Sequence, residues 1–185
     1  MPDMANINKL SEMPPQNLEA EQAFLGALMC IKEINKLLAI IDSGKVKAEY
    51  FYKEAHGKIY EAMVKIIREG KLPDSVTVMT QLEKECLLDK CGGGVYLSIL
   101  IENCPNPTSW ETYTNEFKDS ALRRELIKSG NKQSLNGYQS GEKTVEEICN
   151  ESLGILYEIL KESSNQKNPK NLDFFNGQRI IFSQP

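Results

Sequence analysis

The stretch PPQNLEAEQAFLGALM, residues 14–29, carries the strongest structural signal in this chain. The two prolines at its start cannot continue a helix backward, and Asn17 is well suited to cap a helix that begins just after it. Glu19 and Glu21 then fall in the first turn, where the helix dipole favours negative charge. We therefore predict a capped helix with one face of small side chains, which a second helix can approach closely. That face consists of Ala20, Ala23, Gly26 and Ala27.

Apolar side chains continue to recur at helical spacing beyond this stretch. The pattern predicts helices over residues 31–41, 53–69 and 95–103, and another that begins at Asp74 or Ser75. Three consecutive glycines precede the 95–103 helix, and such a run also occurs in phosphate-binding loops. No strand precedes these glycines and no Lys-Ser/Thr pair follows them. We therefore predict a tight turn between two helices.

Two aromatic or titratable features in this region are predicted to be structural. Tyr50, Phe51 and Tyr52 follow one another in a short connection, and we expect this cluster to pack on the core as a lid. His56, the single histidine, lies on the 53–69 helix. Because no Ser, Cys or carboxylate partner stands in a recognisable arrangement with it, we expect His56 to have a structural role.

Two longer helices are predicted near the end of the chain, over about residues 109–135 and 145–161. A polar, glycine-containing turn joins them, so the pair should form a helical hairpin. Each helix is predicted to begin with a capping box, in which a Thr hydroxyl and a Glu carboxylate satisfy free backbone N–H groups. These boxes are Thr108 with Glu111 and Thr144 with Glu147.

The predicted hairpin has more apolar surface than two helices can bury between them. Such surface is expected to pack on the globular part and on another subunit. The candidate oligomer-interface residues are Trp110, Tyr113, Phe117, Leu122, Leu126, Ile148, Leu156 and Ile159. Basic residues on the first arm are candidates for contact with DNA phosphates or a protein partner, although most such runs are solvated helix faces paired with nearby Glu, and we favour that interpretation. These are Arg123, Arg124 and Lys128.

The composition is that of a soluble globular protein. The chain has 185 residues, of which 41% are hydrophobic and 26% charged, with a formal net charge of −4. This acidic balance argues against a dedicated nucleic-acid-binding surface. We find no signal peptide and no apolar run long enough to span a membrane, so we expect a cytoplasmic location and no membrane partner. The five cysteines form no CxxC pair and indicate neither a disulfide framework nor a metal site.

The segment GYQSGEKT, residues 137–144, differs by one residue from a Walker A loop. Glu142 stands where that motif requires a glycine, and its side chain and negative charge oppose phosphate binding. The preceding residues are polar and helix-like, whereas a phosphate-binding loop follows a β-strand. We therefore interpret the segment as a hairpin turn that ends at Thr144, and we expect no catalytic, cofactor-binding or metal-binding residue in this chain.

Together these features predict an all-α protein with a compact globular helical head, a long helical hairpin and a flexible C-terminal tail. The expected divisions are a disordered N-terminus over residues 1–13, the head over 14–107, the hairpin over 108–162, and a linker or tail over 163–185.

Four segments carry a family resemblance. They are residues 14–29, FYKEAHGKIYEAM at 51–63, PDSVTVMTQLEKECLL at 73–88, and CGGGVYLSILIENCPNPTSWETYTNEFKDSALRREL at 91–126. In this order they resemble the N-terminal domain of bacterial replicative DNA helicases of the DnaB family, over roughly residues 14–161.

This resemblance implies a function. In the family, N-terminal domains form a collar over a ring of motor domains, hairpins pair between subunits, and six copies assemble as a trimer of dimers. The collar docks primase, a helicase loader is a further candidate partner, and direct DNA binding by this part is weak or absent. ATP and Mg²⁺ belong to the motor domain, before which this chain stops. The chain alone is therefore expected to be a scaffold and interaction module.

Three alternatives remain open from the sequence. One is the helicase-interacting C-terminal domain of primase, which resembles the collar in fold but lacks the NLEAEQAFLGALM signature. Another is a stand-alone phage or mobile-element protein that mimics the collar and interferes with helicase assembly. The third is a nucleotide-binding enzyme based on GYQSGEKT. The sequence does not distinguish a truncated helicase from a complete gene product.

Overall fold

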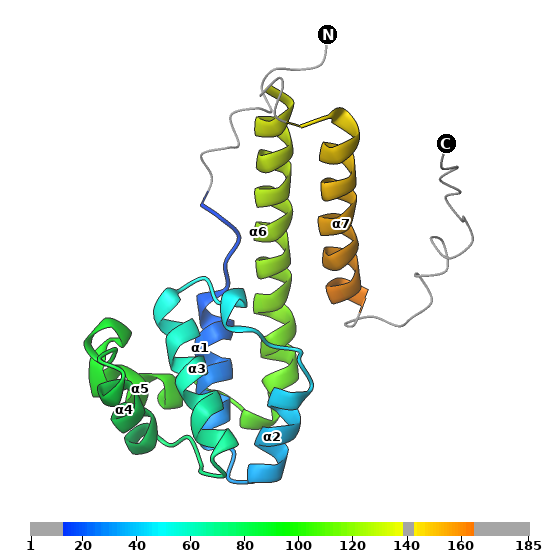
Figure 1. The fold of residues 1–185 in the computed structure, drawn as a ribbon. Coiled ribbons are helices and arrows are strands. Elements are labelled where there is room, and N and C mark those ends of the chain that lie inside the picture. Colours follow the sequence, from blue (N-terminus) through cyan, green and yellow to red (C-terminus); the bar gives the residue numbers. More distant parts are fainter. Residues whose placement is uncertain (1–12, 139–142, 165–185) are drawn as a thin grey trace. The chain divides into compact units, whose positions relative to one another are not determined.

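The computed structural model describes residues 13–138 and 143–164, and all regular secondary structure in these ranges is helical (Figure 1), as predicted. Three short 3-10 turns connect the α-helices: η2 (Ala48–Tyr50), η3 (Asp89–Cys91) and η4 (Pro107–Ser109). The α-helices are α1 (Leu18–Cys30), α2 (Ile34–Asp42), α3 (Glu54–Arg68), α4 (Ser75–Lys84), α5 (Gly93–Glu102), α6 (Trp110–Tyr138) and α7 (Val145–Ser164).

The chain divides into two units, Met1–Arg124 and Glu125–Pro185. We call the first the head and the second the hairpin unit. The division falls inside α6, later than the predicted limit between residues 107 and 108. The reason is that Phe117 and Ala121, in the first half of α6, are buried in the core of the head.

Aromatic rings from distant parts of the chain meet in the core of the head. Phe24 of α1, Phe51 after η2 and Phe117 of α6 are each at most 6% exposed. The ring centroids of Phe51 and Phe117 are 4.9 Å apart in a stacked arrangement, and those of Phe24 and Phe117 are 5.4 Å apart. These contacts join three segments that are far apart in sequence. Tyr50 and Phe51 are buried as expected of the aromatic lid, whereas Tyr52, the third member of the predicted cluster, is 39% exposed.

The small-residue face of α1 packs against α5, as predicted. At Gly26 a Cβ atom would lie 2.0 Å from the carbonyl oxygen of Leu100 and 2.9 Å from Cys104 Cβ. Only glycine allows the two backbones to approach so closely. This contact places the residues that follow α5 beside α1.

Local signals at the ends of the helices are mostly confirmed. The Asn17 side chain accepts a hydrogen bond from the Ala20 N–H at 3.0 Å, and Asp74 Oδ1 accepts one from the Thr77 N–H at 2.8 Å. Gly92, with φ of +92°, forms the predicted turn before α5.

The capping box predicted at Thr108 and Glu111 is wrong. The side chain of Asn106 accepts hydrogen bonds from the N–H and the hydroxyl of Thr108, so Asn106 caps η4. The Glu111 carboxylate instead forms an ion pair with Lys45 at 2.8 Å. The 3-10 turn of η4 separates Thr108 from the first turn of α6.

The hairpin unit contains the end of α6 and all of α7. The predicted capping box at its second helix is confirmed, because Glu147 Oε2 accepts from the Thr144 N–H at 2.7 Å and the Glu147 N–H donates to Thr144 Oγ1 at 3.2 Å. Lys143 forms an ion pair with Glu151, and so does Lys132, at 3.7 Å. The predicted disordered N-terminus and flexible tail lie almost wholly outside the described residues. Glu142 also lies outside them.

The described residues contain neither a membrane-spanning helix nor a cluster of metal ligands. No helix in the described ranges is long and apolar enough to cross a membrane. Within the same ranges, no group of three or more His, Cys, Asp or Glu side chains is arranged to hold a metal ion. The five cysteines are all free thiols.

Candidate functional site

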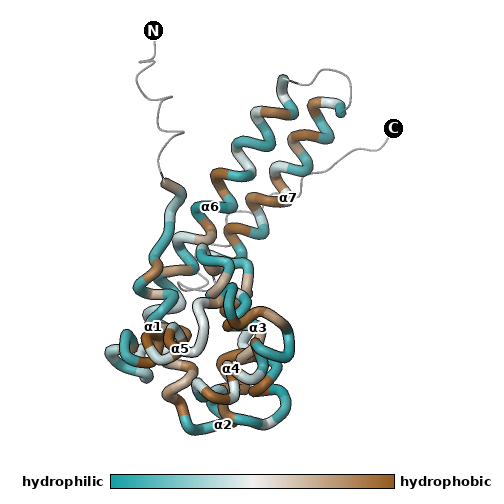
Figure 2. Tube along the Cα trace, turned by 90° about the vertical axis from the view of Figure 1, so that its left-hand side faces the viewer, coloured by the Kyte–Doolittle hydropathy of each residue, from teal (hydrophilic) through white to brown (hydrophobic). Residues whose placement is uncertain are grey.

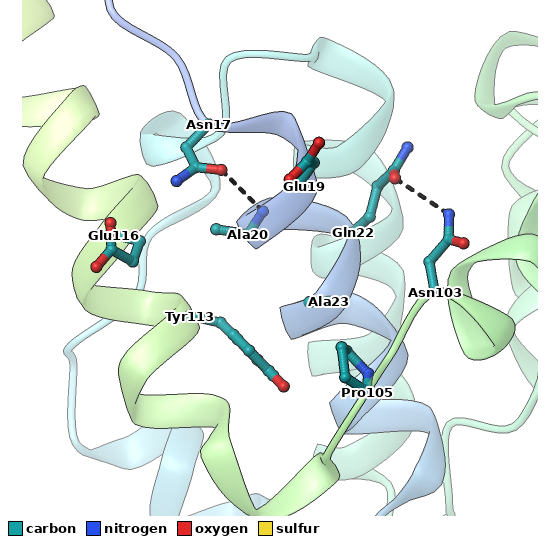
Figure 3. A pocket seen from close by; sticks show the side chains of 9 residues that line it. All are labelled: Asn17, Glu19, Ala20, Gln22, Ala23, Asn103, Pro105, Tyr113 and Glu116. Carbon is teal, nitrogen blue, oxygen red and sulfur yellow. Dashed lines mark hydrogen bonds between the residues drawn. The ribbon is translucent and has the colours of Figure 1, made fainter.

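A groove on the surface of the head is the strongest candidate site (Figure 3). It has a volume of about 570 Å³ and lies between α1, the residues after α5 and the start of α6. Its small apolar surfaces come from alanine side chains and a proline, and its polar groups are amides, carboxylates and a phenol. The lining residues are Asn17, Glu19, Ala20, Gln22, Ala23, Asn103, Pro105, Tyr113 and Glu116.

The groove is acidic. Glu19 and Glu116 are exposed carboxylates on its lining, and none of its described lining residues is basic. Tyr113 is fixed on one wall, because its hydroxyl donates to the Asn106 carbonyl at 3.2 Å and accepts from the Asn106 N–H at the same distance. The groove therefore presents acceptors to a ligand and suits a basic, donor-rich partner.

Two amide side chains line the groove and contact each other. Asn103 Nδ2 donates to Gln22 Oε1 at 3.2 Å, as Figure 3 shows. Gln22 Nε2 in turn donates to the hydroxyl of Tyr96 at 3.1 Å. Gln22 is thus held at both ends of its amide, and its second partner leads into the interior of the head.

Behind the groove lies a buried pair of hydrogen-bonded side chains, Glu21 and His56. His56 Nδ1 is 2.6 Å from Glu21 Oε2, and neither side chain is more than 1% exposed. His56 Nε2 is 2.6 Å from the Tyr96 hydroxyl, and the two rings are stacked with an interplanar angle of 7°. The other oxygen of Glu21 accepts a hydrogen bond from the Tyr52 N–H at 2.6 Å. The carboxylate therefore ties α1 to the start of α3.

The partnership of Glu21 and His56 was not predicted, because Glu21 was expected only to face the helix dipole. A signal for it existed in the sequence. Glu21 shares a helical face with Phe24, Leu25 and Leu28 at spacings of three, four and seven residues. His56 stands in the same relation to Ile59, Tyr60 and Met63. A single ionisable residue in the apolar stripe of each of two helices is typical of a buried pair.

Half of the predicted oligomer-interface residues belong to the head. Phe117 is fully buried in its core, and Leu122 is 9% exposed. Trp110 and Tyr113 are half-buried and pack against the same core. The interface prediction for Phe117 is therefore corrected, because its own chain already encloses the side chain.

The other predicted interface residues lie in the hairpin unit. Leu126 is 49% exposed. Ile148, Leu156 and Ile159 are half-buried. A second apolar stripe on α7 is more exposed, at spacings of four and seven residues. It consists of Leu153, Tyr157 and Leu160, which are 57%, 55% and 50% exposed.

The predicted basic contacts do not form one cationic patch. Arg123 pairs with Asp119 at 2.6 Å and Lys128 with Glu125 at 2.7 Å, both on exposed helix surface. Each positive charge is thus offset by a neighbouring carboxylate. This arrangement agrees with the interpretation of the run as a solvated helix face.

Arg124 has a structural role. Its guanidinium donates to the carbonyl oxygens of Pro15, at 2.8 Å, and Tyr50, at 2.7 Å. Its centre also lies 5.5 Å from the centroid of the Tyr52 ring. These donors hold the segment before α1 and the aromatic lid together, and contact of Arg124 with DNA or a partner stays a prediction.

Known proteins resemble this chain in sequence. A family model described as the DnaB-like helicase N terminal domain matches residues 13–119. The replicative DNA helicase DnaB of Mycobacterium leprae is 32% identical over 148 residues, which cover 79% of this chain and 24% of that protein. The replicative DNA helicase DnaC of Bacillus subtilis is 30% identical over 174 residues, or 93% of this chain and 36% of that protein. The chain thus spans about a quarter to a third of these relatives' length.

Solved structures agree with this result. The N-terminal domain of DnaB helicase from Mycobacterium tuberculosis matches with a TM-score of 0.70 and 29% identity, over 78% of this chain and 99% of that one. A DnaB-like replicative helicase, from a study of its interactions with primase, matches in fold with a TM-score of 0.59 and 20% identity, over 91% of this chain and 36% of that one. This chain belongs to the family of DnaB-like helicase N-terminal domains.

Proposed function

We propose that this chain is the collar of a replicative DNA helicase, which assembles the ring and docks primase. ATP-dependent unwinding is proposed for the whole helicase, in a motor domain outside this chain. No cofactor is proposed for the chain itself, because GYQSGEKT lacks the second glycine of a Walker A loop. We further propose a cytoplasmic location, where DNA replication takes place, and a helicase loader as an additional partner.

Self-association is supported by one observation above all, the exposed apolar stripe of α7. Leu153, Tyr157 and Leu160 are each at least half exposed on one face of the helix. Figure 2 shows apolar positions recurring along both α6 and α7. Large apolar side chains aligned in this way lose water contact when a second copy covers them. We propose that hairpin units pair through this face, first as dimers and then as a hexameric ring.

Primase docking is supported by the groove on the head. The groove combines small apolar surfaces with the carboxylates of Glu19 and Glu116 and the amides of Gln22 and Asn103. A basic segment of primase would meet complementary charge there. By contrast, Arg123 and Lys128 are already paired with carboxylates, so we propose weak or absent DNA binding.

Titration of the chain with two ligands tests this proposal. The ligands are the C-terminal domain of the primase encoded in the same genome and a single-stranded oligonucleotide, in one buffer at near-physiological salt. We expect tighter binding of primase than of DNA. Tight, salt-sensitive DNA binding without detectable primase binding would contradict the collar assignment.

Charge reversal in the groove locates the docking surface. We expect Glu19→Lys and Glu116→Lys each to weaken primase binding at least fivefold, because a like charge then faces the basic partner. Glu83→Lys is the matched control, since Glu83 is an exposed carboxylate on α4 outside the groove. An equal loss in the control would indicate a general charge effect and would remove the groove from the proposal.

A further inference from the structure

A chain of hydrogen bonds runs from the interior of the head to the groove. It passes from Glu21 through His56, Tyr96 and Gln22 to Asn103. The two innermost side chains are buried, the next two are half-buried, and Asn103 is exposed. A buried carboxylate and the wall of the groove are therefore connected by consecutive polar contacts.

The carboxylate sets the direction of this chain. An ionised Glu21 only accepts, so His56 Nδ1 carries a hydrogen and donates to it. In the neutral imidazole Nε2 then accepts, and the Tyr96 hydroxyl donates to it. The Tyr96 oxygen is left to accept from the amide of Gln22, which is the contact observed.

The outer contacts follow the same direction. With its nitrogen turned to Tyr96, Gln22 offers its oxygen to Asn103, and Asn103 Nδ2 donates to it. Asn103 thus presents Oδ1, an acceptor, at the outer end of the chain. Every donor points toward Glu21.

We propose that Glu21 and His56 are positioning residues for the groove: they fix which way the amides of Gln22 and Asn103 face. This inference rests on the proposed docking of a basic partner in the groove. With the amides held in this orientation, the free acceptor at the outer end is the oxygen of Asn103, a residue that lines the groove together with Glu19 and Glu116. The buried pair thereby selects a partner whose docking segment is rich in N–H donors, such as lysine and arginine side chains.

The substitution Glu21→Gln should reverse the direction of these hydrogen bonds with little change in the shape of the side chain. The new amide can accept from the Tyr52 N–H through its oxygen and donate to His56 through its nitrogen, and it gives up only the long contact of 3.5 Å from the Lys53 N–H to Glu21 Oε2. His56 then donates to the Tyr96 oxygen, the Tyr96 hydrogen turns to Gln22, and both outer amides flip. The outer end now presents the Asn103 NH₂ group, a donor that faces the donors of the partner.

Side-chain amide NMR of the full chain tests the coupling without any partner. We expect Glu21→Gln to shift the ¹⁵N–¹H₂ signals of Gln22 and Asn103. We expect no such shift when Tyr96→Phe is also present, because the ring stays and the relay is cut. Unchanged Asn103 signals in a folded Glu21→Gln protein would overturn the inference, since a merely structural carboxylate has no reason to act so far away.

Primase titration with the same variants then measures the consequence. We expect Glu21→Gln to weaken binding about fivefold to tenfold, on the scale of one hydrogen bond, although Glu21 is buried away from the partner. In the Tyr96→Phe background the same change should have no further effect. Additive losses in this double-mutant cycle would overturn the positioning role.

A second double-mutant cycle, at the half-buried positions Gln22 and Tyr96, tests the inference even if the Glu21 variant does not fold. Gln22→Met keeps the length of the side chain and cuts the relay at the half-buried Gln22. We expect Gln22→Met and Tyr96→Phe to weaken primase binding to the same extent, and the double variant no further; a greater loss in the double variant would overturn the inference. If wild type binds no primase at all, the proposed function fails, and the amide signals still decide the inference.

Discussion

The head and the hairpin unit use their apolar side chains in opposite ways. In the head, aromatic rings from α1, the lid and α6 enclose one another, and Phe24, Phe51 and Phe117 are at most 6% exposed. In the hairpin unit, Leu153, Tyr157 and Leu160 stay at least half exposed on one face. The head therefore has its own core, whereas the hairpin unit retains apolar surface that it does not bury itself.

The same difference separates the polar groups of the two regions. The head contains a buried, hydrogen-bonded pair of Glu21 with His56, with hydrogen bonds to further partners. The ion pair of Lys143 with Glu151 in the hairpin unit is 40% exposed on both sides. Removal of one partner from a buried pair strongly destabilises the fold, whereas an exposed ion pair contributes little to stability. Folding is thus specified in the head, and the hairpin unit is suited to association.

The largest contrast is expected from truncating one apolar side chain in each region. Phe117→Ala should lower the free energy of unfolding by ~3–5 kcal/mol, because it leaves a cavity in the core of the head. Leu153→Ala, on the exposed face of α7, should change it by no more than ~0.5 kcal/mol in dilute protein. Urea denaturation followed by circular dichroism measures both. Equal losses would refute the division into a packed head and an open hairpin.

Two glycine substitutions should have opposite signs. Gly26→Ala should destabilise the head by ~1–3 kcal/mol, because its Cβ would lie 2.0 Å from the Leu100 carbonyl oxygen. Gly154→Ala should stabilise α7 by up to ~1 kcal/mol, since no neighbour lies within 4 Å and alanine favours a helix. Thermal unfolding distinguishes the two. A stable Gly26→Ala protein would contradict the close approach of α1 and α5.

Acid should lower the stability of the head by protonating Asp74, the N-cap residue of α4. The hydrogen bond from the Thr77 N–H holds the pKa of Asp74 below its ordinary value of 3.8. A lowered pKa stabilises the fold above the ordinary value, and this contribution is lost as the pH falls through and below that value. Asp74→Ala should cost about 1 kcal/mol at neutral pH. Asp74→Asn keeps the cap, so its stability should vary less between pH 5 and about pH 3; an identical pH profile would exclude this cap as a source of acid sensitivity.

The smallest effect is expected from Lys143 in the hairpin unit. Its ammonium pairs with Glu151, and this interaction lowers the pKa of the Glu151 carboxyl. We expect no binding of a fluorescent ATP analogue by the wild-type chain, and none by Lys143→Ala. Micromolar binding that disappears in the variant would revive the phosphate-loop alternative.

Local signals in the sequence predicted most of the fold. Asn17, Asp74 and the Thr144–Glu147 box cap helices as expected, because a cap depends on residues within one turn. The prediction failed at Thr108, where Asn106 competes for the same N–H group. Periodicity also located the helices α2, α3 and α5 to within a few residues.

The candidate site was harder to predict, because its contacts join residues far apart in sequence. Gln22 and Asn103 meet only when α1 and α5 pack together, and Phe117 is buried where Phe24 and Phe51 pack against it. Helical spacing shows that a side chain is on an apolar face, but it does not say whether its own chain or a second copy covers that face. For this reason the predicted interface contained residues of both kinds.

Sedimentation velocity over a range of protein concentrations tests the division between head and hairpin unit most directly. We predict concentration-dependent association of the wild-type chain, to dimers and then larger rings. Leu153→Glu should reduce it strongly while the circular dichroism spectrum and thermal midpoint of the head are retained, and Val76→Glu, at a position of α4 that is 64% exposed, should leave it intact. A wild-type chain that stays monomeric at high concentration would contradict the account, and so would equal loss of association in both variants.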